Sequence, residues 1–458
     1  MAATMPHPFP ARNRCNRRVF PTGRLQHLGL PVAAVLTGLA AGLGGVAFTY
    51  VLHGIQHVAF GYTEDTFLVG VERASHARRV MALAIGGLLA GLAWWAFRRQ
   101  AGAGIDDEIS VRDAVRSARR MPLVATTLDA LIQIFAVAVG GSLGREGAPR
   151  QAGAALAGEI AVRFRLGERE RRIVLASGAG AGLAAVYNVP LAGAAFTFEV
   201  LLLGVGIGLA ADAVLTSLTA SITATAVAGA ILGTHPVYAL PGISRLSLRL
   251  CVAALILGLI GGLVGRLLVR LTRSAREHAQ RGKTRRRTVV TITLAFTALG
   301  FLAIPAPDLL GNGKALAQLA FDGSFTAWAA LGLALLKPTA TALCLRGGAI
   351  GGILTPSFAT GATLGLAFAG FTHATTDVRV ALVLAGAAAV TASSQKAPIM
   401  AILFACELTA GYGNVGTGRG AAVVIAVLAA TATTRWSPRG RRAPRNVIRR
   451  GRSSAPSV

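Results

Sequence analysis

Charged residues are scarce in this sequence, and acidic ones are scarcest. Only 14% of the 458 residues are charged, whereas a soluble globular protein has about 25%. Asp and Glu together number 19, against 46 Lys and Arg, and 53% of the residues are hydrophobic. A chain of this composition has too little charge for an ordinary water-exposed surface, which excludes a typical soluble protein.

Several chemical motifs are missing as well. The four cysteines show no CxxC spacing, and the histidines have no second ligand at a spacing that holds a metal, so we expect no metal site. The sequence has no phosphate-binding P-loop, no HExxH motif, and no Ser/His/Asp or Cys/His arrangement. We therefore expect neither an enzyme nor a bound cofactor.

Long apolar runs are what the sequence does contain. A helix of about 17–25 apolar residues crosses a bilayer, and such runs recur from Leu30 to Thr434. An open sheet would leave unpaired backbone groups in lipid, so β-structure is not expected. The sequence predicts an all-α polytopic membrane protein. Its single transmembrane domain, residues 30–434, lies between basic tails at 1–29 and 435–458.

The basic residues account for a net charge of +27. Arginines gather in the two tails and in short segments between apolar runs, namely 78–79, 98–99, 112–120 and 270–287. This is the distribution that the positive-inside rule produces. We expect a multi-pass protein of the cell (inner) membrane with both tails cytoplasmic. A membrane protein that binds nucleic acid through its tails is an alternative, but we expect no nucleic-acid partner.

A glycine-rich turn, GGSLGREGAPRQ at Gly140–Gln151, lies between apolar segments and holds Arg145 and Glu146. Ionisable residues at membrane depth mark functional sites. Glycines let the backbone approach a ligand, and a helix that begins there directs free N–H groups and the positive end of its dipole at it. The turn therefore suits a dehydrated anion. The alternative is a surface loop with an exposed ion pair.

Two segments of the chain occur twice. Gly178–Glu199 matches Gly386–Glu407 at an offset of 208 residues, and GGSLGREGAP at Gly140–Pro149 matches GGAIGGILTP at Gly347–Pro356 at an offset of 207. We interpret them as two homologous halves, about 30–235 and 245–434. Breaks at corresponding places in two halves indicate a binding site at their interface. Hydropathy leaves open whether the halves are inverted.

With these motifs, the chain resembles the CLC family of chloride channels and chloride/proton antiporters, in its prokaryotic form without C-terminal CBS domains. Three motifs carry the resemblance: Gly144-Arg145-Glu146-Gly147 for GREGP, Gly352–Pro356 for GxFxP, and Asn188–Gly193 for NAPLAG. Ala148 and Leu354 depart from the usual proline and phenylalanine. The resemblance covers roughly Leu30 to Thr434.

The resemblance implies a homodimer in the lipid bilayer, each subunit an inverted repeat of tilted, partly broken helices. It also implies chloride or a similar small anion as the transported ligand. Residues that would bind the anion are Gly144, Arg145, Gly147, Ile353 and Leu354, with Ala103 at the inner site. Glu146 would be the gate, because its carboxylate competes with the anion for one low-dielectric site and leaves on protonation.

Departures from the family pattern concern the inner site and the protons. Ala103 stands where the family has an anion-binding serine, and no tyrosine follows Thr434 to close that site. Val200 stands where antiporters have a proton-relaying glutamate, with Glu199 one residue before it; these two mark the candidate proton path. We favour channel-like or weakly proton-coupled flow. A tightly coupled chloride/proton antiporter and a secondary transporter of another substrate are the alternatives.

Three further interpretations concern single side chains. Glu199 and Glu407 occupy matching positions, which favours capping or pairing at a helix end over transport. The Arg145 side chain is expected to hold its loop through an ion pair. Tyr187 and Tyr412 are interpreted as aromatic residues at the membrane interface.

Overall fold

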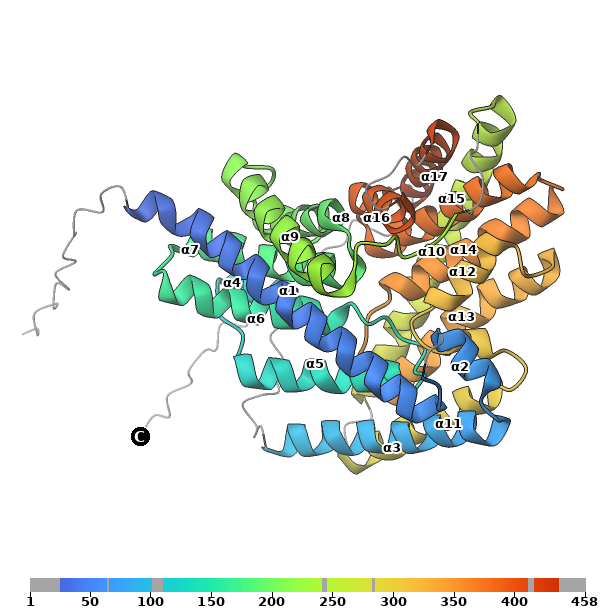
Figure 1. Ribbon diagram of the computed structural model, residues 1–458, viewed down its shortest axis with the longest axis horizontal. Helices are drawn as coiled ribbons and strands as arrows, with labels where there is room; N and C mark the ends of the chain where they lie inside the picture. Colours follow the sequence, from blue (N-terminus) through green and yellow to red (C-terminus); the bar gives the residue numbers. More distant parts are fainter. Residues whose placement is uncertain are drawn as a thin grey trace, which may run out of the picture.

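The computed structural model describes residues 25–63, 66–100, 110–240, 245–281, 285–410 and 416–435. Within these ranges the chain forms 17 α-helices and no β-strand (Figure 1). Seven helices are long and apolar enough to cross a membrane. They are α1, α3, α9, α10, α13, α15 and α17. The predicted all-α polytopic class is confirmed.

The helices form two consecutive series. The first comprises α1 (Leu25–Phe60), α2 (Phe67–Arg73), α3 (His76–Gln100), α4 (Val111–Ser117), α5 (Leu123–Ala138), α6 (Gly147–Arg163), α7 (Glu168–Tyr187), α8 (Pro190–Phe196) and α9 (Ala211–Leu232). The second comprises α10 (Leu248–Arg281), α11 (Arg285–Leu302), α12 (Lys314–Asp322), α13 (Ala327–Gly347), α14 (Leu354–Phe371), α15 (Thr376–Gln395), α16 (Pro398–Ala410) and α17 (Thr417–Arg435). A π-helical turn, Thr197–Leu202, continues α8. Helix α1 begins inside the segment predicted as the N-terminal tail.

The two series pack alike. Helix α1 packs on α9 as α10 does on α17, α6 on α7 as α14 does on α15, and α7 on α9 as α15 does on α17. Between the series, α3 packs on α11 and α8 on α16. Figure 1 shows the green helices of the first series mainly on the left and the orange and red ones of the second on the right. The packing is what two copies of one unit produce.

The repeat is also visible in single residues at the ends of equivalent helices. Asn188 directly follows the last residue of α7 and Lys396 that of α15, and both residues have a φ of 56°. A left-handed residue ends a helix because it turns the chain off the helical path. Pro190 and Pro398 then begin α8 and α16, as proline favours the first helical turn.

Glycines allow the same close crossing in both halves. A Cβ on Gly178 would overlap the carbonyl oxygen of Gly153, where α6 crosses α7. A Cβ on Gly386 would overlap the carbonyl oxygen of Gly361, where α14 crosses α15. Gly178 and Gly386 are 208 residues apart, and so are Gly153 and Gly361. Small residues let membrane helices approach until their backbones touch, which brings the starts of α6 and α14 into the centre of the protein.

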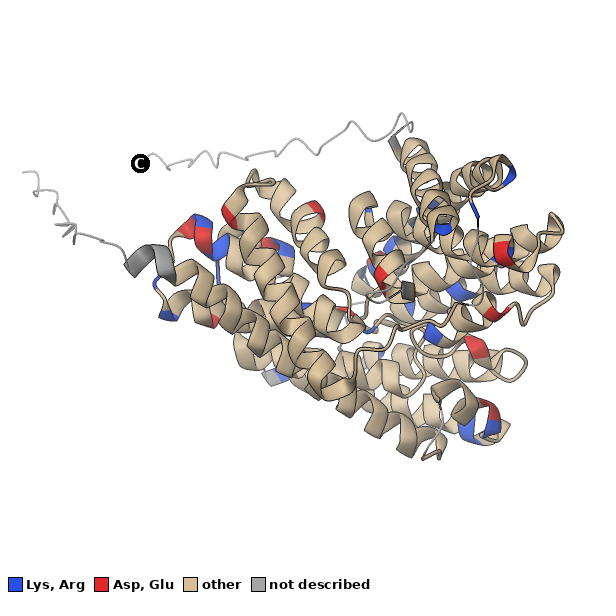
Figure 2. Ribbon diagram, turned by 45° about the horizontal axis from the view of Figure 1, so that its top comes forward, with Lys and Arg blue, Asp and Glu red and all other residues tan. Residues whose placement is uncertain are grey.

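The outer helix faces are apolar, and charge is confined to few places. Leu43, Ile85, Leu215 and Leu263 are each more than half exposed on the long helices. In Figure 2 the helix bodies are mostly tan, and Lys, Arg, Asp and Glu lie largely near helix ends. Apolar side chains that face outward over the length of a span are the contacts that lipid requires.

Candidate functional site

The two glycine turns meet in the centre of the fold. Gly144 donates its N–H to the carbonyl oxygen of Gly352 at 2.8 Å, and Gly352 donates to Gly144 at 2.9 Å. The turns therefore run antiparallel at this contact. A Cβ on either glycine would overlap the carboxylate of Glu146, so a side chain at either position would push that carboxylate out of its place.

Glu146, the residue before α6, directs its carboxylate at the start of α14 and is fully buried. Its Oε1 accepts the backbone N–H of Leu354 at 2.6 Å. Its Oε2 accepts the hydroxyl of Thr355 at 3.2 Å, and the hydroxyl of Tyr187 lies 3.5 Å away. Free N–H groups and the dipole at a helix start stabilise an anion. The carboxylate thus fills a place built for a negative charge.

Arg145 and Tyr187 correct two of the interpretations from sequence. Arg145 donates to the carbonyl oxygen of Val186 at 3.1 Å, and its guanidinium lies 5.1 Å from the centre of the Tyr187 ring. It forms no ion pair within the described residues, so the predicted ion pair is wrong. Tyr187 is buried beside Glu146 and does not lie at a membrane interface. Tyr412 lies outside the described residues.

Two more arginines fix the backbone of the turns. Arg150 donates to the carbonyl oxygen of Glu146 at 2.8 Å and stacks over Phe196 at 5.0 Å. Arg276 of α10 donates to the carbonyl oxygen of Gly351 at 3.1 Å. Because each guanidinium holds a carbonyl and not a carboxylate, the positive charge around the site is not cancelled by these contacts.

Lys337 of α13 is a fully buried cation that sequence reasoning overlooked. Its Nζ donates to the Ser142 hydroxyl at 2.9 Å and to the carbonyl oxygens of Leu309 and Gly311 at 2.9 and 2.8 Å. All three partners are neutral, and Ser142 belongs to the first glycine turn. A lysine inside an apolar run, directly before Pro338, is a recognisable pattern of a functional position.

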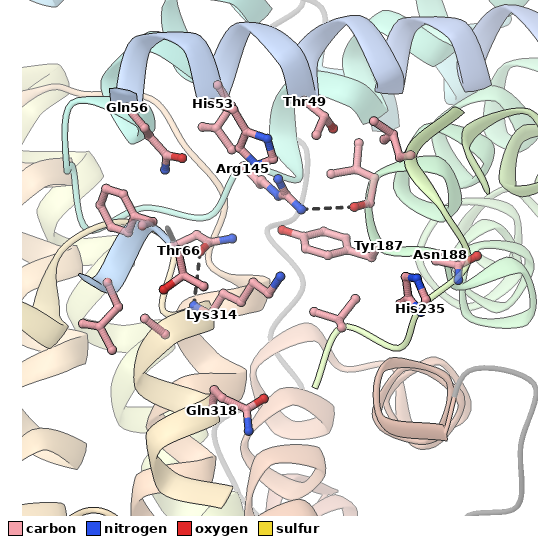
Figure 3. Close-up of a pocket in the computed structure, with 18 of the residues that line it drawn as sticks. Thr49, His53, Gln56, Thr66, Arg145, Tyr187, Asn188, His235, Lys314 and Gln318 are labelled. Atoms are coloured by element: carbon pink, nitrogen blue, oxygen red, sulfur yellow. Dashed lines mark hydrogen bonds between the residues drawn. The ribbon is translucent and has the colours of Figure 1, made fainter. Parts of the chain in front are cut away.

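A cavity of about 680 Å³ lies beside Arg145 and Tyr187, and the Tyr187 hydroxyl is 3.5 Å from the Glu146 carboxylate. Arg145, Tyr187, His53 and Lys314 line it, and Figure 3 shows their side chains around the same space. Lys314 lies on the short helix α12, outside the spans, where burial and the nearby Arg145 lower its pKa to about 8. The cavity thus presents positive charge beside the residue that fills the anion place.

Glu199 and Glu407 cap each other's helices in the opposite half. Glu199 accepts the N–H groups of Ile399 and Met400 at 3.1 and 2.7 Å, at the start of α16. Glu407 accepts those of Leu191 and Ala192, both at 2.8 Å, at the start of α8. The four contacts repeat at an offset of 208 residues. These are the helix-end contacts that the repeat favours for both glutamates.

The structure brings most of the predicted site residues together. Gly144, Glu146 and Gly147 lie against Ile353 and Leu354, and Gly147 begins α6 as Leu354 begins α14. Val200 lies apart on the π-turn, where its carbonyl oxygen accepts a bond from Arg112 at 3.4 Å. Ala103 lies outside the described residues.

Sequence comparison identifies relatives over most of the chain. The family model "Voltage gated chloride channel" matches residues 86–435. A ClcB-like chloride channel protein of Ralstonia nicotianae is 32% identical over 83% of this chain and 88% of its own length. The H(+)/Cl(-) exchange transporter ClcA of Vibrio parahaemolyticus is 28% identical over 83% of this chain and 82% of its own.

Structure comparison agrees on the fold. A slow cyanobacterial Cl-/H+ antiporter superposes with a TM-score of 0.76 at 22% identity, covering 89% of this chain and 94% of that one. A CLC-type fluoride/proton antiporter has a TM-score of 0.70 at 22% identity, covering 89% and 95%. The predicted CLC-type fold is confirmed. The similar proteins include both channels and exchangers by name.

Proposed function

Because the chain belongs to the CLC family of voltage-gated chloride channels and chloride/proton antiporters, we propose that it carries chloride through a pathway gated by Glu146. Members of this family transport anions and need no cofactor, so the chain is a transport protein and not an enzyme. The position of the Glu146 carboxylate on the Leu354 amide supports the gate. A chloride ion and this carboxylate compete for the same helix start.

Gating follows from the chemistry of that competition. The ionised carboxylate accepts the Leu354 amide and the Thr355 hydroxyl. Protonation removes its charge and weakens both bonds, since a charged acceptor binds roughly twice as strongly as a neutral one. The side chain then leaves and chloride takes over the free N–H groups. Arg145 and Lys314 attract the anion into the adjoining cavity.

Coupling to protons is the finer part of the proposal. We favour channel-like or weakly coupled flow, because Val200 cannot carry a proton and the Glu199 carboxylate is occupied at the start of α16. A tightly coupled chloride/proton antiporter is the competing function, and it has the support of relatives named as exchangers. Fixed-ratio proton movement would favour this second function.

Assembly and orientation are part of the same proposal. The second halves of the two series, α8–α9 and α16–α17, expose Leu191, Leu215, Ile399 and Leu428. Such apolar faces suit the homodimer that the family implies. The basic ends of α3, α10 and α11 and the basic tails are proposed to face the cytoplasm of a bacterial cell.

The test is chloride efflux from liposomes that contain the purified protein, with a pH probe in the same assay. The Glu146→Ala variant should raise chloride efflux or remove its pH dependence, because no carboxylate remains to compete with the ion. Glu277→Ala is a matched control on the exposed end of α10 and should leave both unchanged. A Glu146→Ala variant with the wild-type rate and pH profile would contradict the gate.

A further inference from the structure

Asp129 of α5 is a buried carboxylate that the gate mechanism does not use. The described residues contain three buried carboxylates: Asp129, Glu146 and Asp308. Asp129 is 5% exposed and forms no ion pair with any described residue. Its two oxygens accept the indole N–H of Trp94 at 2.9 Å and the amide of Gln133 at 2.7 Å. An ionised carboxylate held only by neutral donors is costly inside a membrane protein, so the contacts of Asp129 leave its charge without a partner of opposite sign.

Polar groups connect Asp129 to the gate. The Gln133 amide nitrogen also donates to Gln151 of α6 at 2.8 Å. The Gln133 amide oxygen lies against Gly147, where a Cβ would come within 2.6 Å of it. This oxygen accepts no hydrogen bond from a described residue, and Gly147 directly follows Glu146. A protonated Glu146 that leaves the Leu354 amide would therefore find an acceptor in the direction of Asp129.

The position of Asp129 along α5 places it on the way from the basic side of the protein. Helix α5 begins at Leu123, shortly after Arg119 and Arg120, and Asp129 is six residues further on, about 9 Å along the helix axis. Trp94 lies four residues before Arg98 on α3, which packs against α5. Asp129 thus stands between the basic end of these helices and the gate.

The surroundings of Asp129 make its charge state matter for the anion. Helices α1, α3 and α6 pack on α5. Trp94 of α3 and Gln151 of α6 belong to its network, both uncharged, and no charged side chain of these helices bonds to Asp129 in the described part of the chain. An uncompensated negative charge near the pathway repels chloride. Protonation of Asp129 removes that repulsion.

We propose that Asp129 is the carboxyl group that passes protons between the basic side and Glu146. Neither candidate from the sequence can do this, because the Glu199 carboxylate is bonded to the start of α16 and Val200 has no acidic group. Asp129 takes a proton from solution on the basic side and gives it to the Glu146 carboxylate once that side chain has left the Leu354 amide, so that the O–H bond on Asp129 breaks as one forms on Glu146. The Gln133 amide donates to Asp129 and positions it, and does not itself carry the proton. The inference rests on the proposed gate function of Glu146. It gives the weak proton coupling a definite path.

The Asp129→Asn variant tests the path in liposomes, with chloride efflux and proton movement recorded together. Proton movement per chloride should fall by at least about tenfold, since a positioned proton-transfer group typically contributes 10²–10⁴-fold in rate. Chloride efflux should persist. Asp129→Glu should restore proton movement, which a merely structural role would not require. Asp308→Asn removes another buried carboxylate, in the connection after α11, and should leave proton movement unchanged.

The outcomes separate this inference from the proposed function. Wild-type protein that moves chloride without protons would overturn the Asp129 path and leave chloride transport standing. So would an Asp129→Asn variant with wild-type proton movement. Absence of chloride efflux from the wild type would instead contradict the proposed function. If Asp129→Asn does not yield monodisperse protein, the Gln133→Met variant replaces it in the same assay. Loss of proton movement is then the expected result, and wild-type proton movement would contradict the path.

Discussion

The two halves of the molecule are alike at some positions and opposed at others. Glu199 and Glu407 perform the same contact in each half, and Asn188 and Lys396 end equivalent helices with the same φ. At the turns the halves differ, because Glu146 supplies a carboxylate on one side and Leu354 supplies an amide on the other. The two halves share the residues that hold helices in place. They differ at the proposed anion site, where one half contributes a carboxylate and the other a backbone amide.

A second break in the symmetry concerns buried charge. Asp129 and Lys337 are 208 residues apart, close to the 207 that separate the glycine turns after them. Both are buried and bonded to neutral groups. Opposite charges at nearly equivalent places mean that the two halves contribute differently to the electrostatics of the pathway. We expect substitutions at broken positions to change transport and substitutions at matched positions to change stability.

The largest effect is expected from Lys337→Met. The substitution leaves Ser142 and the carbonyl oxygens of Leu309 and Gly311 without their donor, which costs about 1–3 kcal/mol in free energy of unfolding. It also removes a buried positive charge near the anion site, so chloride efflux should fall. Thermal unfolding in detergent and liposome efflux measure the two parts. Lys396→Met, at the left-handed residue that follows α15, is the control and should leave efflux unchanged. Equal efflux in the two variants would contradict the expectation that positions where the halves differ control transport.

A smaller and symmetrical effect is expected from Glu199→Gln and Glu407→Gln. Each variant places an amide where one helix N–H group previously had an acceptor, and loss of a helix cap costs about 0.5–2 kcal/mol. The two losses of stability should agree within a few tenths of a kcal/mol, as calorimetry or thermal unfolding can show. Lost proton movement in Glu199→Gln alone would instead assign Glu199 to the proton path and weaken the case for Asp129.

The smallest effect is expected from Lys314 at the edge of the cavity. Burial and Arg145 lower its pKa to about 8, so it is positive below that pH and loses its charge as the pH on the cavity side rises through about 8. Chloride efflux should then decline by about two- to threefold, since water and salt screen the charge. Glu146→Gln protein isolates this effect from the gate. Adding Lys314→Met should abolish the decline, and a persisting decline would assign it to another group.

Much of the fold could be predicted from the sequence because a membrane-spanning helix requires a long apolar run, which is visible in the sequence. Apolar runs of spanning length between Arg-rich segments predicted the helices, and offsets of 207 and 208 residues predicted the repeat that the packing shows. Gly144, Glu146 and Leu354 were predicted as site residues from their motifs, and the structure brings them together. The ion pair of Arg145 and the interface position of Tyr187 were wrong, since local sequence does not state which face a side chain takes.

The sequence by itself determined that helices cross a membrane and that glycine turns interrupt them at corresponding places, because hydrophobic length and backbone freedom are local properties. Only the tertiary structure decided that the Glu146 carboxylate rests on an amide 208 residues away, that Lys337 joins the first glycine turn to the loop at Leu309 and Gly311, and that Asp129 accepts the indole N–H of Trp94. These contacts join distant segments. They depend on how the two halves pack, and packing places each buried charge beside a partner that its own neighbourhood in the chain does not contain.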